Sequence, residues 1–236
     1  MIIPSRVFDP AKEWNLSFDG NDSVAIPYLA DYQLGTNNFS VEFWAYPVLG
    51  SGGSTDWDLF WSMEGSSWFY IGKVRSPINN GWVIRVSIGG TSYNNLTTAI
   101  AAANINRWVF VQGAVDRGNN RMDIRVYDPS VDTWYEDDVT LPAAGDITVD
   151  GDAHIGQTGD GTNYVSNNTK ICGTQTFNYA RTKAQAIAGM YRRLTGRESG
   201  LIGYYPFLDK TGATLKDWSN NGNDGTITGA TWTKGT

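Results

Sequence analysis

The sequence contains little of what metal and disulfide chemistry usually require. Its 236 residues include one cysteine, Cys172, and one histidine, His154. A single histidine excludes a zinc site built from several histidines, and a lone cysteine in an alternating segment is typical of a small core residue. A chain of this length buries enough surface to fold without a disulfide. We therefore expect structural roles for both residues.

Basic runs are also absent. Lysine and arginine total 18 against 24 aspartates and glutamates, which gives a net charge of −6 and an isoelectric point near 4.7. This acidic balance argues against nucleic acid and anionic membranes as partners. No stretch of about 18 apolar residues occurs, so we expect no membrane insertion.

The first eight residues do not resemble a secretory signal, because the segment is short and Pro4 interrupts it early. If Met1 is the natural start, we expect synthesis and release in the cytoplasm. A place on an extracellular or virion surface would then follow assembly.

Motifs of common enzymes are missing too. The sequence has no Gly-x-Ser-x-Gly elbow, no Gly-x-x-x-x-Gly-Lys phosphate loop and no Glu-x-Asp-x-x-Glu strand of the glycan-hydrolase kind. A retaining hydrolase needs two carboxylates about 5 Å apart. Asp56 and Asp58 share a strand face without a matching glutamate, and residues 136–138 suggest a solvated acidic turn. We therefore predict no enzymatic activity and no catalytic residue.

Aromatic residues are abundant, with 10 tryptophans and 12 tyrosines, and many lie in alternating segments. Residues 39–46 are the clearest strand: one face is apolar and expected in the core, while the other carries Glu42, Trp44 and Tyr46. This second face suits either a covered surface or an open sugar-binding surface. Residues 108–115 are apolar on both faces apart from Gln112, which predicts a central strand covered on each side.

One helix is predicted near the C-terminus. Thr182 can cap its first turn together with Gln185, and Gly196 would end it. The apolar stripe of this helix would comprise Ile187, Tyr191 and Leu194. We expect it to cover the edge of a sheet. Residues 50–55 are rich in glycine and serine and are short enough for a loop within one domain.

Several segments carry a resemblance to a known family. They are residues 16–22 (LSFDGND), 39–44 (FSVEFW), 107–118 (starting RWVFV and ending DRG), 204–207 (YYPF) and 217–226 (DWSNNGNDGT). Together they resemble laminin-G-like domains of the concanavalin A-like, pentraxin-type jelly-roll superfamily. The resemblance implies an all-β fold, a two-sheet antiparallel jelly-roll sandwich with one short helix, that covers residues 1–236 as a single domain.

The order of these segments departs from the family pattern, because the segment that normally opens the domain comes last. A circular permutation would explain this order: residues 200–236 would complete the sandwich beside the first strand. A swapped arrangement, in which residues 200–236 close a neighbouring copy, would have the same sequence.

The loop at residues 217–225 is dense in oxygen ligands. Asp217, Ser219 and Asn221 occupy positions one, three and five of an EF-hand pattern, but the later positions do not fit, so an EF-hand is excluded. The family resemblance implies instead a structural calcium ion at the sandwich rim. Its predicted ligands are Asp22, Asp217, Asn223 and Asp224. The alternative is a loop that satisfies its own polar groups through side-chain turns.

Tryptophans beside polar loops suggest a glycan site, because aromatic rings stack on the apolar faces of sugars while amides and carboxylates bind hydroxyls. The predicted ligand-binding residues are Trp57, Asp160, Asn163 and Tyr164. Two competing interpretations are burial in the core and contact with another subunit of a homo-oligomer.

These observations together predict a non-enzymatic recognition or adhesion module whose partner is a glycan or cell-surface polysaccharide. Two alternatives stay open, since one jelly roll hosts many functions. The first is a structural surface component of a virus particle, such as a phage fibre, tail or capsid decoration protein, that contacts other virion or surface proteins. The second is a glycan-cleaving enzyme of the same superfamily.

Overall fold

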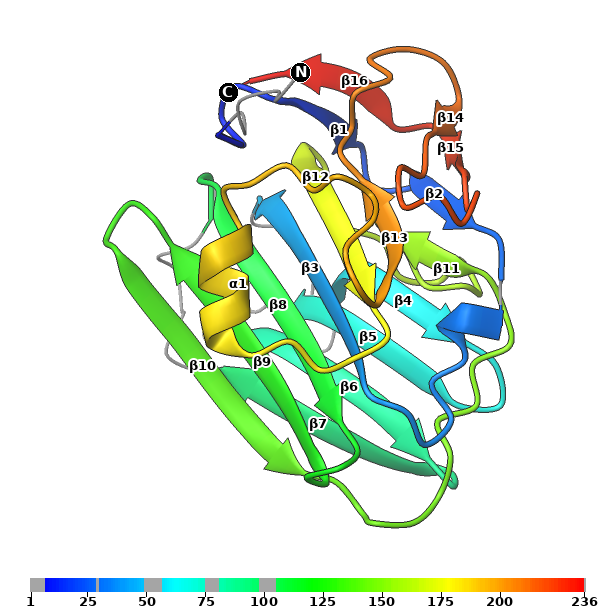
Figure 1. Ribbon diagram of the computed structural model, residues 1–236. Helices are drawn as coiled ribbons and strands as arrows, with labels where there is room; N and C mark the ends of the chain where they lie inside the picture. Colours follow the sequence, from blue (N-terminus) through cyan, green and yellow to red (C-terminus); the bar gives the residue numbers. More distant parts are fainter. Residues whose placement is uncertain (1–6, 29, 49–56, 75–80, 98–104, 236) are drawn as a thin grey trace.

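The computed structural model describes residues 7–28, 30–48, 57–74, 81–97 and 105–235. Two antiparallel sheets lie face to face, and one core of aromatic and aliphatic side chains fills the space between them (Figure 1). The predicted all-β sandwich with one short helix is therefore confirmed. The loop predicted at residues 50–55 and the acidic position Asp56 lie outside the described residues.

The first sheet has eight strands in the order β10-β9-β8-β3-β12-β1-β16, and β13 also pairs with β12. Their bounds are β1 Trp14–Phe18, β3 Phe39–Tyr46, β8 Val109–Asp116, β9 Arg121–Asp128, β10 Thr133–Thr140, β12 Thr169–Phe177, β13 Leu201–Tyr205 and β16 Thr231–Lys234.

The second sheet also has eight strands, in the order β14-β15-β2-β11-β4-β5-β6-β7. Their bounds are β2 Ser23–Ile26, β4 Trp57–Glu64, β5 Trp68–Val74, β6 Trp82–Ile88, β7 Thr91–Thr97, β11 Ala153–Ile155, β14 Thr214–Leu215 and β15 Gly225–Thr228. A 3₁₀ turn, η1 (Ala30–Tyr32), precedes β3.

The C-terminal segment contributes strands to both sheets. β13 pairs with β12 and β16 pairs with β1 in the first sheet, while β15 pairs with β2 in the second. The first and last strands of the chain are therefore neighbours (Figure 1). The circularly permuted single domain stays a prediction, and these pairings accommodate it within one copy of the chain.

The core forms where the alternating segments meet. Phe39 and Phe43 of β3 point inward as predicted and pack on the second sheet: Phe43 stacks on Phe60 with ring centroids 5.9 Å apart, and Phe39 meets Phe69 edge-on at 5.7 Å. Strand β8 lies between β3 and β9 and is buried along nearly its whole length, which confirms the central strand predicted there. Cys172 and His154 are both buried strand residues.

Helix α1 spans Lys183–Gly189 and begins as predicted. The Thr182 hydroxyl accepts the Gln185 N–H, and the Gln185 side-chain oxygen accepts the Thr182 N–H at 2.8 Å. The predicted end at Gly196 is wrong, because the helix already ends at Met190. No helix within the described ranges combines the length and apolar character needed to cross a membrane.

The apolar stripe predicted for this helix is wrong as well. Ile187 is 47% exposed, and Tyr191 and Leu194 lie beyond the helix end. The buried positions are small residues instead, because the helix lies close to the arginine before it: a Cβ added to Gly189 would stand 2.7 Å from an Arg181 nitrogen.

Candidate functional site

The outer side of the second sheet brings together three of the four residues predicted to bind a ligand. Trp57, at the start of β4, and Asp160 and Asn163, in the loop after β11, line one cavity of about 80 Å³. Tyr164 does not line it. That residue forms an isolated β-bridge with Gln157 and is half-buried.

Flat side chains follow one another across this face, and we call the set the aromatic ladder: Trp57, Arg85, Trp68 and Tyr70. The Arg85 guanidinium lies 4.7 Å from the Trp57 ring centroid and 4.9 Å from that of Trp68. Trp68 stacks on Tyr70, with centroids 5.0 Å apart and an interplanar angle of 6°. All four side chains are partly exposed. A cation over an indole ring stabilises both groups, so the ladder is ordered before any ligand arrives.

Strand register explains why these residues meet. Tyr70 of β5 pairs with Arg85 of β6, which pairs with Asn94 of β7, so all three lie on the same outer face. Trp68 is two residues from Tyr70 and shares that face. The Arg85 Nε donates to the Asn94 side-chain oxygen, which fixes the guanidinium over the rings.

The loop beside the ladder is held by its own hydrogen bonds. The Asp160 carboxylate accepts the hydroxyls of Thr158 and Thr162 at 2.6 and 2.7 Å, and the Thr162 N–H at 3.0 Å. These bonds hold the pKa of Asp160 below its ordinary value, so the carboxylate stays ionised. The Asn163 N–H donates to the Thr158 hydroxyl at 3.0 Å and its side-chain NH₂ donates to the Thr162 hydroxyl at 3.0 Å, which holds the Asn163 side chain at the cavity.

Glu64 ties the loop to the ladder. Its Oε1 accepts the Tyr70 hydroxyl at 2.7 Å and the Gly159 N–H at 3.0 Å. Burial and the hydrogen bond to Glu64 raise the pKa of Tyr70, so its phenol stays protonated. Glu64, Trp68, Tyr70 and Arg85 are absent from the sequence prediction. The alternation of Trp68 and Tyr70 was a signal for them, but only the pairing of β5 with β6 brings Arg85 between the indoles.

The outer face of the first sheet was the other possible sugar surface, and it is covered. A row of polar side chains crosses five of its strands; the row consists of Gln175, Glu42, Gln112, Arg125 and Glu136. Glu42 is fully buried and accepts three hydrogen bonds, from Arg181 at 2.7 Å, Gln112 at 2.7 Å and Gln175 at 2.8 Å. Burial raises the pKa of Glu42 despite the adjacent Arg181.

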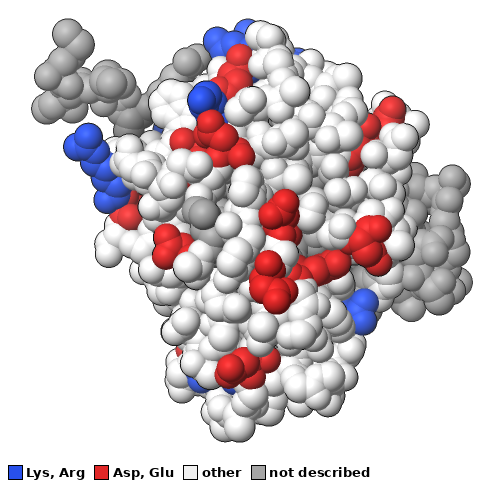
Figure 2. Space-filling view, turned by 90° about the vertical axis from the view of Figure 1, so that its right-hand side faces the viewer, with Lys and Arg blue, Asp and Glu red and all other residues white. Residues whose placement is uncertain are grey.

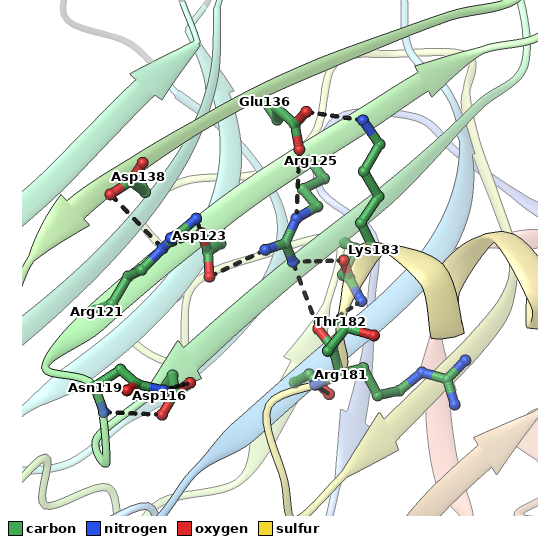
Figure 3. Close-up of polar contacts among 12 residues, drawn as sticks. Asp116, Asn119, Arg121, Asp123, Arg125, Glu136, Asp138, Arg181, Thr182 and Lys183 are labelled. Atoms are coloured by element: carbon green, nitrogen blue, oxygen red, sulfur yellow. Dashed lines mark hydrogen bonds and ion pairs between the residues drawn. The ribbon is translucent and has the colours of Figure 1, made fainter.

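Helix α1 and ion pairs close this surface, which we call the closed face. Arg125 donates to the Gln112 side-chain oxygen at 2.9 Å and lies 3.2 Å from Asp123, while Lys183 of the helix pairs with Glu136 at 2.8 Å (Figure 3). The Trp44 indole N–H donates to the Met190 carbonyl at 2.9 Å. The aromatic and carboxylate side chains of residues 39–46 therefore support packing here.

The predicted calcium ligands do not form one set. In the β2–β15 ladder Ser23 lies opposite Thr228, so Asp22 lies beyond one end of β15 while Asp224 precedes the other end. A strand of this length spans roughly 13 Å. Within the described ranges, no three His, Cys, Asp or Glu side chains gather as a metal-binding group.

Hydrogen bonds inside the loop also use the carboxylates. Asp217 accepts the N–H groups of Tyr204 and Ser219 through one oxygen and the Asn223 N–H, at 3.0 Å, through the other. Asp224 accepts the Asp217 N–H at 2.9 Å and pairs with a lysine. These bonds occupy the carboxylates as a self-satisfied loop would, but the buried Asn223 Oδ1 has no hydrogen-bond partner within the described residues. Calcium at this rim stays a prediction.

No family model matches the chain, and no curated protein does. Solved structures share its architecture at low sequence identity. A structure named as a "putative carbohydrate binding protein" from Bacteroides ovatus has a TM-score of 0.67 at 18% identity, over 95% of this chain and 60% of that one. A heptameric pentraxin from Limulus polyphemus has a TM-score of 0.58 at 12% identity, over 96% and 97% of the two chains.

Two further structures bear on the predictions. The LG4–5 domains of the mouse laminin α1 chain have a TM-score of 0.51 at 11% identity, over 78% of this chain and 48% of that one. The enzymatically active domain of bacteriophage CBA120 tailspike protein 2 has a TM-score of 0.56 at 8% identity, over 89% and 35%. The fold is a laminin-G-like jelly roll. The chain spans about half to two thirds of the Bacteroides and laminin structures that it matches.

Proposed function

We propose that this chain is a carbohydrate-binding module and that the aromatic ladder is its sugar platform. One observation carries the proposal: partly exposed, pre-ordered rings lie directly beside a polar loop, over one small cavity. A sugar ring needs both kinds of contact, an apolar surface for its C–H face and polar groups for its hydroxyls.

Each group has a defined part in this proposal. The Trp57 ring would stack on the apolar face of a sugar, while the Asn163 amide, the Asp160 carboxylate and Arg85 would bind hydroxyls at its edge. The cavity of about 80 Å³ is much smaller than the roughly 300–1,000 Å³ of typical small-molecule pockets. We therefore expect a platform that contacts one sugar unit and binds it weakly.

Recognition without catalysis is part of the proposal. Glu64 and Asp160 are carboxylates beside the ladder, and both already accept hydrogen bonds that hold the loop. The similarity in fold to the Bacteroides ovatus structure named as a "putative carbohydrate binding protein" supports a binding role. The fold shared with a phage tailspike supports the alternative of a virion-borne domain, which concerns where the module is carried rather than what it binds.

The test begins with a glycan array probed with the whole chain, followed by calorimetric titration of the strongest hit. We expect Trp57→Ala to lower the affinity about tenfold, since one stacked ring contributes on the order of 1 kcal/mol. Trp218→Ala is the matched control, because this tryptophan is 50% exposed and is not part of the ladder. Unchanged affinity in Trp57→Ala would refute the site, and release of reducing ends from the hit would refute the non-enzymatic role.

A further inference from the structure

A second cleft is lined by residues just before β3 and just after β12. This end of the sandwich lies away from strands β1 and β16 (Figure 1). The volume of the cleft is about 620 Å³, within the range of small-molecule sites. The segment 30–39, the turn between β8 and β9, and residues 178–179 form its walls. The polar and aromatic lining consists of Asp31, Gln33, Asn37, Asn38, Asn178 and Tyr179. We call it the amide cleft.

Two of its amides are held in a fixed orientation. The Asn38 side-chain oxygen accepts the Arg117 N–H at 2.7 Å, and the Gln33 side-chain oxygen accepts the Val149 N–H at 3.2 Å. Because each oxygen is occupied by backbone, each amide presents its NH₂ group as the remaining donor. Both donors belong to residues that line the cleft, so they are available to an acceptor bound there.

Among the described lining residues, Tyr179 is the one aromatic residue that is not buried, and its ring is fixed as well. Tyr179 packs edge-on against Phe177, with ring centroids 5.5 Å apart and an interplanar angle of 66°. The Ser40 hydroxyl donates to the Tyr179 carbonyl at 2.8 Å, which holds the backbone at this position. Because the ring and the amide donors are already ordered, the protein loses little conformational entropy when a ligand binds.

Charge decides which kind of ligand fits. Among the described residues that line the cleft, Asp31 is the only one with an ionisable carboxyl group, and none is a lysine or arginine. Acidic side chains outnumber basic ones on the side of the molecule seen in Figure 2, which adjoins β2 and β11. Within the cleft itself, the Asp31 carboxylate would repel an anionic ligand. Hydroxyl groups both donate and accept hydrogen bonds. A neutral ligand rich in hydroxyls therefore suits the amide NH₂ donors, the Asp31 carboxylate acceptor and the remaining amides, which donate and accept.

We propose that the amide cleft is a second ligand site that takes a neutral, polyhydroxylated ligand of the saccharide class. It shares no lining residue with the cavity at the aromatic ladder. The chain would therefore hold two separate sites, and two weak contacts to one polysaccharide raise the overall affinity through effective concentration. Ligand binding at the amide cleft does not depend on the aromatic ladder, so experiments can refute one proposed site and leave the other unaffected.

The experiment uses an array that carries neutral and acidic oligosaccharides, probed with the wild type, Trp57→Ala, the double variant Asn37→Ala/Asn178→Ala, and all three changes combined. Asn37 and Asn178 make no side-chain hydrogen bond within the described part of the chain, so the double variant should fold normally. Asn167→Ala, an exposed position outside both sites, is the matched control.

We expect the double variant to lose about tenfold in affinity for neutral oligosaccharides both in the wild-type and in the Trp57→Ala background, because each lost hydrogen bond contributes on the order of 1 kcal/mol. Titration of the strongest neutral hit should shift the side-chain NH₂ signals of Asn37 and Asn178 in ¹⁵N spectra. Unchanged affinity of the double variant for every neutral oligosaccharide would overturn the cleft, as would signals that stay unshifted. Capture of acidic oligosaccharides alone would overturn the charge argument.

Discussion

The two outer faces of the sandwich carry similar residues in different roles: one face is covered, and the other is partly exposed. The closed face carries Glu42, Trp44 and Arg125, and the open face carries Glu64, Trp57 and Arg85. On the closed face the fully buried Glu42 accepts three hydrogen bonds, and the segment that ends helix α1, with Met190 and Tyr191, contacts the tryptophan. On the open face the arginine lies against two partly exposed indoles.

The comparison teaches that a strand with aromatic and charged residues does not reveal whether its face is a binding surface. A face is closed to ligands when another element of the fold covers it and hydrogen-bonds with its polar groups. Removal of one partner from a buried ion pair strongly destabilises the fold. Partly exposed aromatic side chains, by contrast, leave surface area that a ligand can contact.

Removal of Glu42 should have the largest effect. Glu42→Ala leaves Arg181 buried without its carboxylate, so we expect the free energy of unfolding to fall by about 3–5 kcal/mol. Arg85→Ala on the open face loses two cation–π contacts, which should cost about 1–2 kcal/mol. Urea unfolding of the two variants measures both values. Equal losses would contradict the contrast between the faces.

Matched tryptophan variants separate stability from binding. Trp44→Ala should lower the free energy of unfolding by about 3–5 kcal/mol, as expected for a buried tryptophan. Its affinity for an array-selected glycan should remain that of the wild type where the variant is folded. Trp57→Ala should show the reverse pattern, with little loss of stability and about tenfold weaker binding. Calorimetry and thermal unfolding on the same preparations give both quantities.

Acidification should weaken glycan binding at the open face only at low pH. The folded pKa of Asp160 is lowered by the hydroxyls of Thr158 and Thr162, so its contribution to the loop is complete above the unfolded value of about 3.9. The contribution is lost as the pH falls through the lower folded value. We expect glycan affinity to be constant from about pH 7 to 5 and to fall only below about pH 4. Asp160→Asn should lack this final fall, and a midpoint near neutrality would contradict the assignment.

Calcium removal should have the smallest effect. The carboxylates of Asp217 and Asp224 already accept backbone N–H groups, and Asp22 lies at the far end of β15. We expect the melting temperature in EDTA and in calcium chloride to agree. A clear rise with calcium would instead support the rim site implied by the family resemblance, through ligand-linked stabilisation.

Much of the fold could be predicted from the sequence, because alternation and the segments at residues 16–22, 39–46 and 107–118 report local strand structure. The helix end could not be predicted, because Gly196 resembles a terminator but the helix already ends at Met190. The local sequence pattern predicts structure well where a single strand determines it. The pattern fails where contacts with residues distant in the sequence determine the structure.

The candidate site shows the same division. Trp57, Asp160 and Asn163 could be named from their types and polar surroundings, and the structure brings them to one cavity. Arg85 could not be named, because only the register between β5 and β6 places it between two indoles. Tyr164 has a suitable side chain, but the bridge to Gln157 places it outside the cavity.

Hydroxyl-radical footprinting with mass spectrometry, with and without an array-selected glycan, tests the central claim most directly. It reports the exposure of each tryptophan in one experiment. We expect Trp57 and Trp68 to react readily in the free protein and to be protected by the glycan, while Trp44 stays unreactive in both states. Rapid reaction of Trp44, or a glycan that binds without protecting Trp57, would contradict this claim.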